Sequence, residues 1–189
     1  RPDVQVHFIT FSTNKMGDAL DPWSAFTASI CQLRPESRGW VRIKSPDPLA
    51  APEIHPNFLG TEFDRRVTVE GLQKLRAIMR EPAMQGFVQA ETEPGPERVD
   101  DDAVLEFCRE RGASIYHPSC SARMGTDDMA VVDPRLRVHG VAGLRVVDAS
   151  IMPAVVSGNS NAAIIMIAEK ASDMILQDSR GGSDIGTGS

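Results

Sequence analysis

The feature that most constrains the fold is a strand-to-helix block near the C-terminus. Residues 144–148 form a short apolar segment that ends in an aspartate, and residues 162–168 form the longest apolar run in the chain. Between them, Gly158-Asn159-Ser160-Asn161 contains residues that commonly begin a helix. Because residues 162–168 are apolar on every side, we expect the helix that spans about 160–176 to be buried all round.

Upstream of this block, the sequence predicts strands followed by helices. Three segments rich in β-forming residues are expected to be strands: residues 4–11, 25–33 and 40–44. Turn residues at 34–39 favour a hairpin between the last two strands. Four prolines within residues 45–57 predict an irregular connection, because proline removes a backbone donor.

The helices are expected in the middle of the chain. Two segments combine an apolar stripe with helix-start and helix-stop residues: residues 61–79 and 100–112. Further short strands are expected at residues 131–133 and 144–148. Strands first, helices next and a strand-to-helix finish are typical of an α+β fold.

The bulk composition excludes several classes of protein. A net charge of −6 over 189 residues argues against a general nucleic-acid binder, which shows a basic face. No apolar run approaches the roughly 20 residues that cross a bilayer, and the start has no signal-peptide pattern, so membrane association is not indicated. The three cysteines, Cys31, Cys108 and Cys120, favour a reducing, cytoplasmic compartment over a disulfide framework. The start at Arg1, with a strand already under way, suggests a piece of a longer protein.

Three places could carry chemistry, and each has a plain structural alternative. His117 precedes Pro118, which restricts its backbone, so a side chain suited to proton transfer could be aimed rigidly; otherwise it is an ordinary histidine. Residues 158–161 could bind an electron-rich ligand at a helix start, or only cap the helix. Asp148 could face a ligand at the end of its strand, or cap the following turn.

Two other kinds of site are not expected. His117 and Cys120 lie close in sequence, but a zinc site needs four ligands in close pairs. The chain contains no Cys-x-x-Cys or His-x-x-x-His spacing, so we predict no metal site. A serine or cysteine hydrolase is not favoured either, because Ser119 lacks a Gly-x-Ser-x-Gly context; we expect Cys120 to be a packed thiol.

An ordered series of motifs resembles the C-terminal part of the glucose–methanol–choline (GMC) family of flavin-dependent oxidoreductases, nearest to its choline-dehydrogenase-like branch. The resemblance covers about residues 25–178. The motifs lie at residues 34–39, 56–59, 116–125 (YHPSCSARMG), 131–140, 143–153 (GLRVVDASIMP), 158–162 (GNSNA) and 167–170. Their order makes the resemblance far more specific than any single motif.

The resemblance implies a role for each candidate residue. His117 matches the family's active-site histidine, which handles the proton of the substrate hydroxyl, and Asn159 matches its second catalytic residue. Asp148 and Ala149 match the strand end that approaches FAD. Gly158, Asn159, Ser160 and Asn161 match the helix start that faces the flavin. The implied substrate is a small primary alcohol, with choline as one candidate, and the implied reaction is proton removal with hydride transfer to flavin N5.

The resemblance also implies how the chain is organised. Residues 1–125 would form a substrate-binding domain, an antiparallel sheet with flanking helices. Residues 126–178 would supply the closing strands and C-terminal helix of an FAD-binding domain, and residues 179–189 a flexible tail. The chain lacks the Gly-x-Gly-x-x-Gly loop that binds the FAD diphosphate. We therefore expect the partner to be an N-terminal FAD-binding portion of the same protein, without which this chain neither holds FAD tightly nor turns over.

Two alternatives stay open. A hydroxynitrile-lyase-like member would keep the flavin site and use the histidine for acid–base cleavage. A non-catalytic α+β domain would only bind a partner. Reduction of bound flavin by an alcohol would separate the first alternative from an alcohol-oxidising enzyme.

Overall fold

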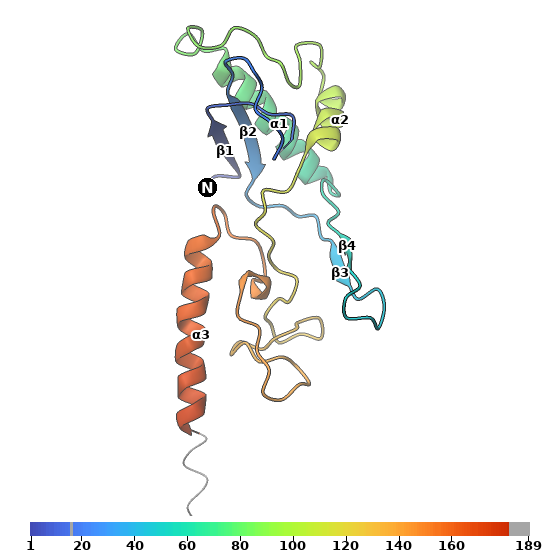
Figure 1. The fold of residues 1–189 in the computed structure, drawn as a ribbon, viewed down its shortest axis with the longest axis vertical. Coiled ribbons are helices and arrows are strands. Elements are labelled where there is room, and N and C mark those ends of the chain that lie inside the picture. Colours follow the sequence, from blue (N-terminus) through green and yellow to red (C-terminus); the bar gives the residue numbers. More distant parts are fainter. Residues whose placement is uncertain (16, 182–189) are drawn as a thin grey trace, which may run out of the picture. The chain divides into compact units, whose positions relative to one another are not determined.

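The computed structural model describes residues 1–15 and 17–181 and divides the chain into two units, Arg1–Ala113 and Ser114–Ser189 (Figure 1). In the first unit, β1 (Val4–Ile9) pairs antiparallel with β2 (Thr27–Gln32), with Val4 opposite Gln32 and Ile9 opposite Thr27. Helix α1 (Glu62–Met79) lies against this strand pair. The approach is close at Gly71, where an added Cβ would lie 3.3 Å from the Val4 side chain.

The core of the first unit lies between α1, the strand pair and α2 (Asp101–Arg111). It consists of aliphatic side chains from all three, chiefly Val69, Leu72, Leu75, Val104, Ala28 and Ile30. Both helices begin where a side chain caps them: Thr61 Oγ1 accepts from Asp64 N at 3.1 Å, and Asp100 Oδ1 accepts from Ala103 N at 2.8 Å. The predicted helices at 61–79 and 100–112 are confirmed to within their capping residues.

The predicted hairpin between residues 25–33 and 40–44 is wrong. Strand β3 (Trp40–Arg42) pairs instead with β4 (Glu53–His55), which lies within the stretch expected to be irregular. The reason is the buried Asp64 carboxylate at the start of α1, which accepts hydrogen bonds from Glu36 N and Ser37 N, both at 2.8 Å. These bonds hold the chain after β2 at the N-terminus of α1, so it cannot turn back beside β2.

The second unit is organised by loops, the 3₁₀ turn η1 (Ala149–Ile151) and α3 (Asn161–Gly181). Residues 131–133 and 144–148, expected to be strands, contribute only isolated bridges, such as Val132 with Val138 and Arg137 with Arg145. A turn prevents longer pairing, because Asp133 Oδ1 accepts from Arg135 N and Arg137 N. The core consists of Val132, Leu136, Ile151, Met152, Ile167 and Ala171.

The sequence predicts that helix α3 is buried all round, and this prediction is wrong. Ile167 and Ala171 are buried, whereas Ile165 and Met166 are each 55% exposed. The helix also runs through residues 179–181, the start of the expected flexible tail; the rest of that tail, residues 182–189, lies outside the described residues. Within the described part of the chain, no helix has the length and apolarity needed to span a bilayer.

Antiparallel strand pairs together with separate helices make the fold α+β, as predicted.

Candidate functional site

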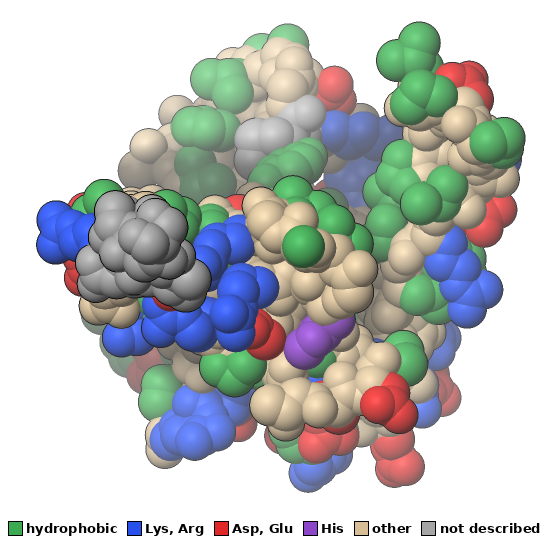
Figure 2. All heavy atoms as spheres, turned by 90° about the horizontal axis from the view of Figure 1, so that it is seen from below, with side chains coloured by type: hydrophobic (Ala, Val, Ile, Leu, Met, Phe, Trp, Pro, Cys, Tyr) green, Lys and Arg blue, Asp and Glu red, His purple; other side chains and the backbone are tan. Residues whose placement is uncertain are grey.

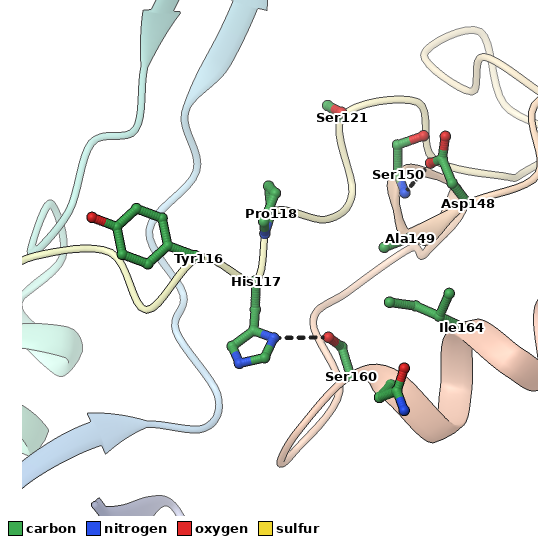
Figure 3. A pocket seen from close by; sticks show the side chains of 10 residues that line it. Tyr116, His117, Pro118, Ser121, Asp148, Ala149, Ser150, Ser160 and Ile164 are labelled. Atoms are coloured by element: carbon green, nitrogen blue, oxygen red, sulfur yellow. Dashed lines mark hydrogen bonds between the residues drawn. The ribbon is translucent and has the colours of Figure 1, made fainter. Parts of the chain in front are cut away.

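The second unit contains a pocket of about 560 Å³. It lies where the loop around His117, the η1 turn and the start of α3 come together (Figure 3). The side chains that line it are Tyr116, His117, Pro118, Ser121, Asp148, Ala149, Ser150, Ser160, Asn161 and Ile164.

The loop that carries His117 is held against η1 by backbone hydrogen bonds. Cys120 N donates to the Ala149 carbonyl at 3.2 Å, and the next bonds join Ala122 to Ser150 and Met124 to Ile151. Tyr116, just before His117, adopts φ 60°, a left-handed conformation that few non-glycine residues take. Pro118 limits the backbone on the other side. The backbone around His117 is therefore restricted on both sides.

Asp148 both caps a turn and lines the pocket. Its Oδ1 accepts from Ser150 N at 2.7 Å, which makes Asp148 the N-cap of η1. Its residue is exposed and belongs to the pocket lining together with Ala149. Asp148 therefore caps the turn that follows it, as one of its two predicted roles requires, and it also belongs to the pocket lining.

The start of α3 supplies the opposite wall. Ser160 is 5% exposed, and its carbonyl accepts from Ile164 N at 3.0 Å in the first turn of the helix. Its hydroxyl lies 3.0 Å from Nδ1 of His117, a contact that joins two residues 43 positions apart. In Figure 3 the imidazole points toward Ser160 along this bond. Among the described residues, the other ring nitrogen, Nε2, has no hydrogen-bond partner.

The structure brings together five of the seven residues proposed from the sequence: His117, Asp148, Ala149, Ser160 and Asn161. Gly158 and Asn159 precede Ser160 but do not line the pocket, and Asn159 is exposed.

Sequence reasoning missed Tyr116, Pro118, Ser121, Ser150 and Ile164 as lining residues. All but Ser121 are neighbours of predicted residues or lie on the first turn of the predicted helix. That proximity was the available signal. Ser121 lies in the same motif as His117, residues 116–125, but no pattern in the sequence indicated the contact between His117 and Ser160.

Charged groups fix α3 relative to the rest of its unit. Asp178, near the helix end, accepts from Arg135 Nη2 at 2.6 Å and from Arg145 Nη2. Hydrogen bonds from these two guanidinium groups hold the pKa of the Asp178 carboxyl below its usual range, and the bond from Arg145 contributes the most. The pairs anchor one end of the helix and so help to set where its N-terminus meets His117.

Burial disfavours the reactive form of two of the three thiols. Burial raises the pKa of the Cys31 and Cys108 thiols, which disfavours the reactive thiolate. Cys120 packs against the core of the second unit, as the sequence predicts. In the described residues, no three His, Cys, Asp or Glu side chains cluster as metal ligands would.

A family model described as GMC oxidoreductase matches residues 35–168, more than half of the chain. The oxygen-dependent choline dehydrogenase of Serratia proteamaculans is 44% identical over 176 residues, which are 93% of this chain and 32% of that protein. The corresponding protein of Burkholderia pseudomallei is 45% identical over 93% of this chain and 31% of its own length. The chain therefore spans about a third of the curated relatives that it matches.

Solved structures agree with these relatives. Pyridoxine 4-oxidase from Mesorbium loti superposes with a TM-score of 0.82 at 30% identity, covering 92% of this chain and 34% of that one. A fungal aryl-alcohol oxidase superposes with a TM-score of 0.74 at 35% identity, covering 84% of this chain and 26% of that one. The motif order, the fold and these matches agree, and the chain belongs to the GMC oxidoreductase family.

Proposed function

We propose that this chain is the C-terminal part of an FAD-dependent oxidoreductase that oxidises a primary alcohol. The observation that carries the proposal is the His117 imidazole at a pocket walled by the start of α3. One ring nitrogen is bonded to Ser160, and the other has no hydrogen-bond partner within residues 1–15 and 17–181. Family membership and the activities after which the similar proteins are named, choline dehydrogenase and aryl-alcohol oxidase, support the same reaction class.

The residues around the pocket fit a flavin. The first-turn N–H groups of a helix have no partner within the helix and carry partial positive charge, which suits the electron-rich edge of an isoalloxazine ring. Ser160 and Asn161 stand at this helix start, and Asp148 with Ala149 forms the adjacent wall. We propose that these residues, with Gly158 and Asn159, hold FAD, which when bound accepts a hydride from the substrate carbon.

The chain's own residues would manage the proton and the alcohol oxygen. The O–H proton of the substrate passes to Nε2 of His117 as the C–H hydrogen leaves with its electron pair, and the product is the carbonyl compound. We assign to Asn159 the role of holding the substrate oxygen through its carboxamide. Asn159 adjoins Ser160 in sequence, and Ser160 contacts His117, which supports this placement.

For the substrate we propose a small primary alcohol of the choline type. Two relatives that cover most of this chain are named choline dehydrogenases. Tyr116, the aromatic residue of the pocket lining, is 71% exposed and adjoins His117. An aromatic face attracts a quaternary ammonium group through its π electrons.

We propose that the partner is an N-terminal FAD-binding portion of the same protein. Hydrophobic side chains remain on the surface of this chain, and Figure 2 shows several on one face. Two exposed hydrophobic residues, Ile165 and Met166, lie on α3 near the helix start that lines the pocket. In this organisation residues 1–125 form the substrate-binding domain and residues 126–178 complete the FAD-binding domain.

The test uses the complete protein that contains this chain. The purified protein is expected to carry FAD, and choline or another primary alcohol added without oxygen should bleach the visible absorbance of the flavin. His117→Gln should keep the flavin and lose the bleaching, because glutamine cannot accept the proton. A flavin that no alcohol reduces, alongside histidine-dependent cleavage of a hydroxynitrile, would support the lyase-like alternative instead.

A further inference from the structure

We propose that Ser160 is a positioning residue that sets the tautomer and ring orientation of His117, an inference that rests on the proposed function of His117 as the proton acceptor. Ser160 is one of the buried polar side chains of the described chain, at 5% exposure. Its Oγ lies 3.0 Å from Nδ1 of His117. The two residues come from separate segments, so the contact is not a by-product of local chain geometry.

Both ends of this hydrogen bond are anchored. The Ser160 carbonyl accepts from Ile164 N, so the backbone of Ser160 moves with the first turn of α3. On the other side, the bond from Cys120 N to the Ala149 carbonyl and the restricted backbone at Pro118 hold the His117 loop. A bond between two fixed segments can orient the imidazole, whereas a bond to a mobile side chain could not.

The direction of the bond decides whether His117 can act as a base. A neutral imidazole carries one N–H, on either Nδ1 or Nε2. When Nδ1–H donates to the Ser160 oxygen, the lone pair is on Nε2, which is free to accept the substrate proton. When the hydroxyl instead donates to Nδ1, the hydrogen is on Nε2 and His117 cannot accept a proton there.

We assign the first direction, with Ser160 as acceptor. This arrangement also persists through the reaction, because an imidazolium protonated on both nitrogens still donates from Nδ1 to the same oxygen. Ser160 therefore keeps the ring in place while the proton arrives and leaves. Serine is also common at helix starts, so the alternative to a positioning role is that Ser160 only caps α3.

The experiment separates positioning from capping in the complete flavin-bound protein. Ser160→Ala removes the hydroxyl, Ser160→Thr retains it, and Ser160→Gly removes it while keeping a residue that helix starts tolerate. Ser172→Ala is the matched control, an exposed serine on α3 whose hydroxyl bonds Ala168 O. Steady-state kinetics are measured together with ¹⁵N NMR of histidine-labelled protein, in which His117→Gln identifies the His117 signals.

Ser160→Ala and Ser160→Gly are expected to lower kcat on the order of 10- to 100-fold with little change in KM, the loss typical when an orienting partner of a functional histidine is removed. Ser172→Ala should stay near wild type, and Ser160→Thr, which retains the hydroxyl, should keep the Nδ1–H tautomer of His117. The nitrogen shifts should report Nδ1–H in neutral wild-type His117, and a move toward Nε2–H in the alanine and glycine variants. If Ser160→Ala does not fold, the glycine variant provides the same two readouts.

An unchanged His117 tautomer and unchanged kcat in both hydroxyl-free variants would overturn the proposal and leave Ser160 as a cap. A wild-type Nε2–H tautomer would also overturn it. The nitrogen shifts do not depend on turnover, so they decide the role of Ser160 even if no alcohol reduces the flavin. That separate result, failure of flavin reduction in wild type, would count against the proposed function instead.

Discussion

Replacing Asp64 tests the account of how the first unit is held together. The carboxylate is 1% exposed and accepts from Gln32 Nε2 at 2.9 Å, from Glu36 N and Ser37 N at 2.8 Å, and from the Ser37 hydroxyl. Asp64→Asn leaves one acceptor oxygen, which still serves Gln32 and Glu36. The new amide group is itself a donor, and it replaces the oxygen that faces Ser37 N.

The expected loss can be worked from these bonds. A partly buried N–H left without an acceptor costs about 1–3 kcal/mol, and the remaining bonds lose the strength that a charged acceptor gives. The Ser37 hydroxyl cannot accept from the new amide in compensation, because its oxygen already accepts from Gly60 N and Thr61 N. We therefore expect the loop at residues 34–39 to be destabilised by about 2–3 kcal/mol in Asp64→Asn, and by more in Asp64→Ala, which removes both oxygens.

Hydrogen exchange measures this local effect in the complete protein, where global unfolding need not be two-state. At about 1.4 kcal/mol per factor of ten, a 2 kcal/mol loss makes the amides of residues 34–39 exchange about 30-fold faster. Asp18→Asn, a change at an exposed carboxylate, is the matched control and should leave the loop unchanged. Equal exchange in the two variants would refute the role assigned to Asp64.

The pH dependence gives a second signature of the same carboxylate. Burial raises the pKa of Asp64, but hydrogen bonds from Ser37, Glu36 and Gln32 outweigh it and hold the pKa below its usual 3.8. A group with a lowered folded-state pKa contributes stability above its unfolded pKa and loses it as pH falls through the folded value. The difference between wild type and Asp64→Asn should therefore be full near neutral pH and shrink below about pH 4.

Three further changes test other parts of the structure. Asn159→Ala should lower kcat/KM for the alcohol by about tenfold or more while the flavin is retained, because a hydrogen bond to the substrate oxygen is lost; unchanged kinetics would remove Asn159 from the site. Ile165→Glu places a charge on the exposed apolar face of α3 and should weaken FAD retention in the complete protein, measured as the flavin-to-protein absorbance ratio. Gln177→Glu, near the other end of the helix, is the control and should leave that ratio unchanged. Arg76→Met should destabilise the loop at residues 91–98 by about 3–5 kcal/mol, because the Gly95 and Arg98 carbonyls and the Glu91 carboxylate lose their buried donor. Limited proteolysis should then cut this loop faster than in wild type, and equal cleavage rates would contradict the prediction.

Local signals in the sequence were sufficient for the helices and for most of the pocket. The caps Thr61 and Asp100 and the apolar stripes that follow them define α1 and α2. The pocket is built from the segments around His117, Asp148 and Ser160, and each of these segments carries a turn or helix-start signal in the sequence.

Non-local contacts could not be predicted in the same way. The path of the chain after β2 depends on Asp64, which accepts a hydrogen bond from Glu36 N, 28 positions away, and no local pattern encodes that bond. The same holds for the bond between His117 and Ser160. In both cases a side chain forms a hydrogen bond to a residue far away in the sequence, and hydrophobic periodicity predicts only local structure.

The exposed face of α3 shows a different reason for a mismatch. The sequence predicts burial all round, yet Ile167 and Ala171 are buried while Ile165 and Met166 remain half-exposed. Fully burying an aliphatic side chain of this size contributes about 1.5–3 kcal/mol, so covering the exposed half of each would add on the order of 1 kcal/mol per residue. The pattern of residues 162–168 is thus consistent with burial by a further part of the protein, the same part that we propose carries FAD. If Ile165→Glu weakens FAD retention while Gln177→Glu does not, the predicted burial of α3 on every side holds for the complete protein. The exposure of Ile165 and Met166 would then mark the surface that contacts the proposed FAD-binding portion.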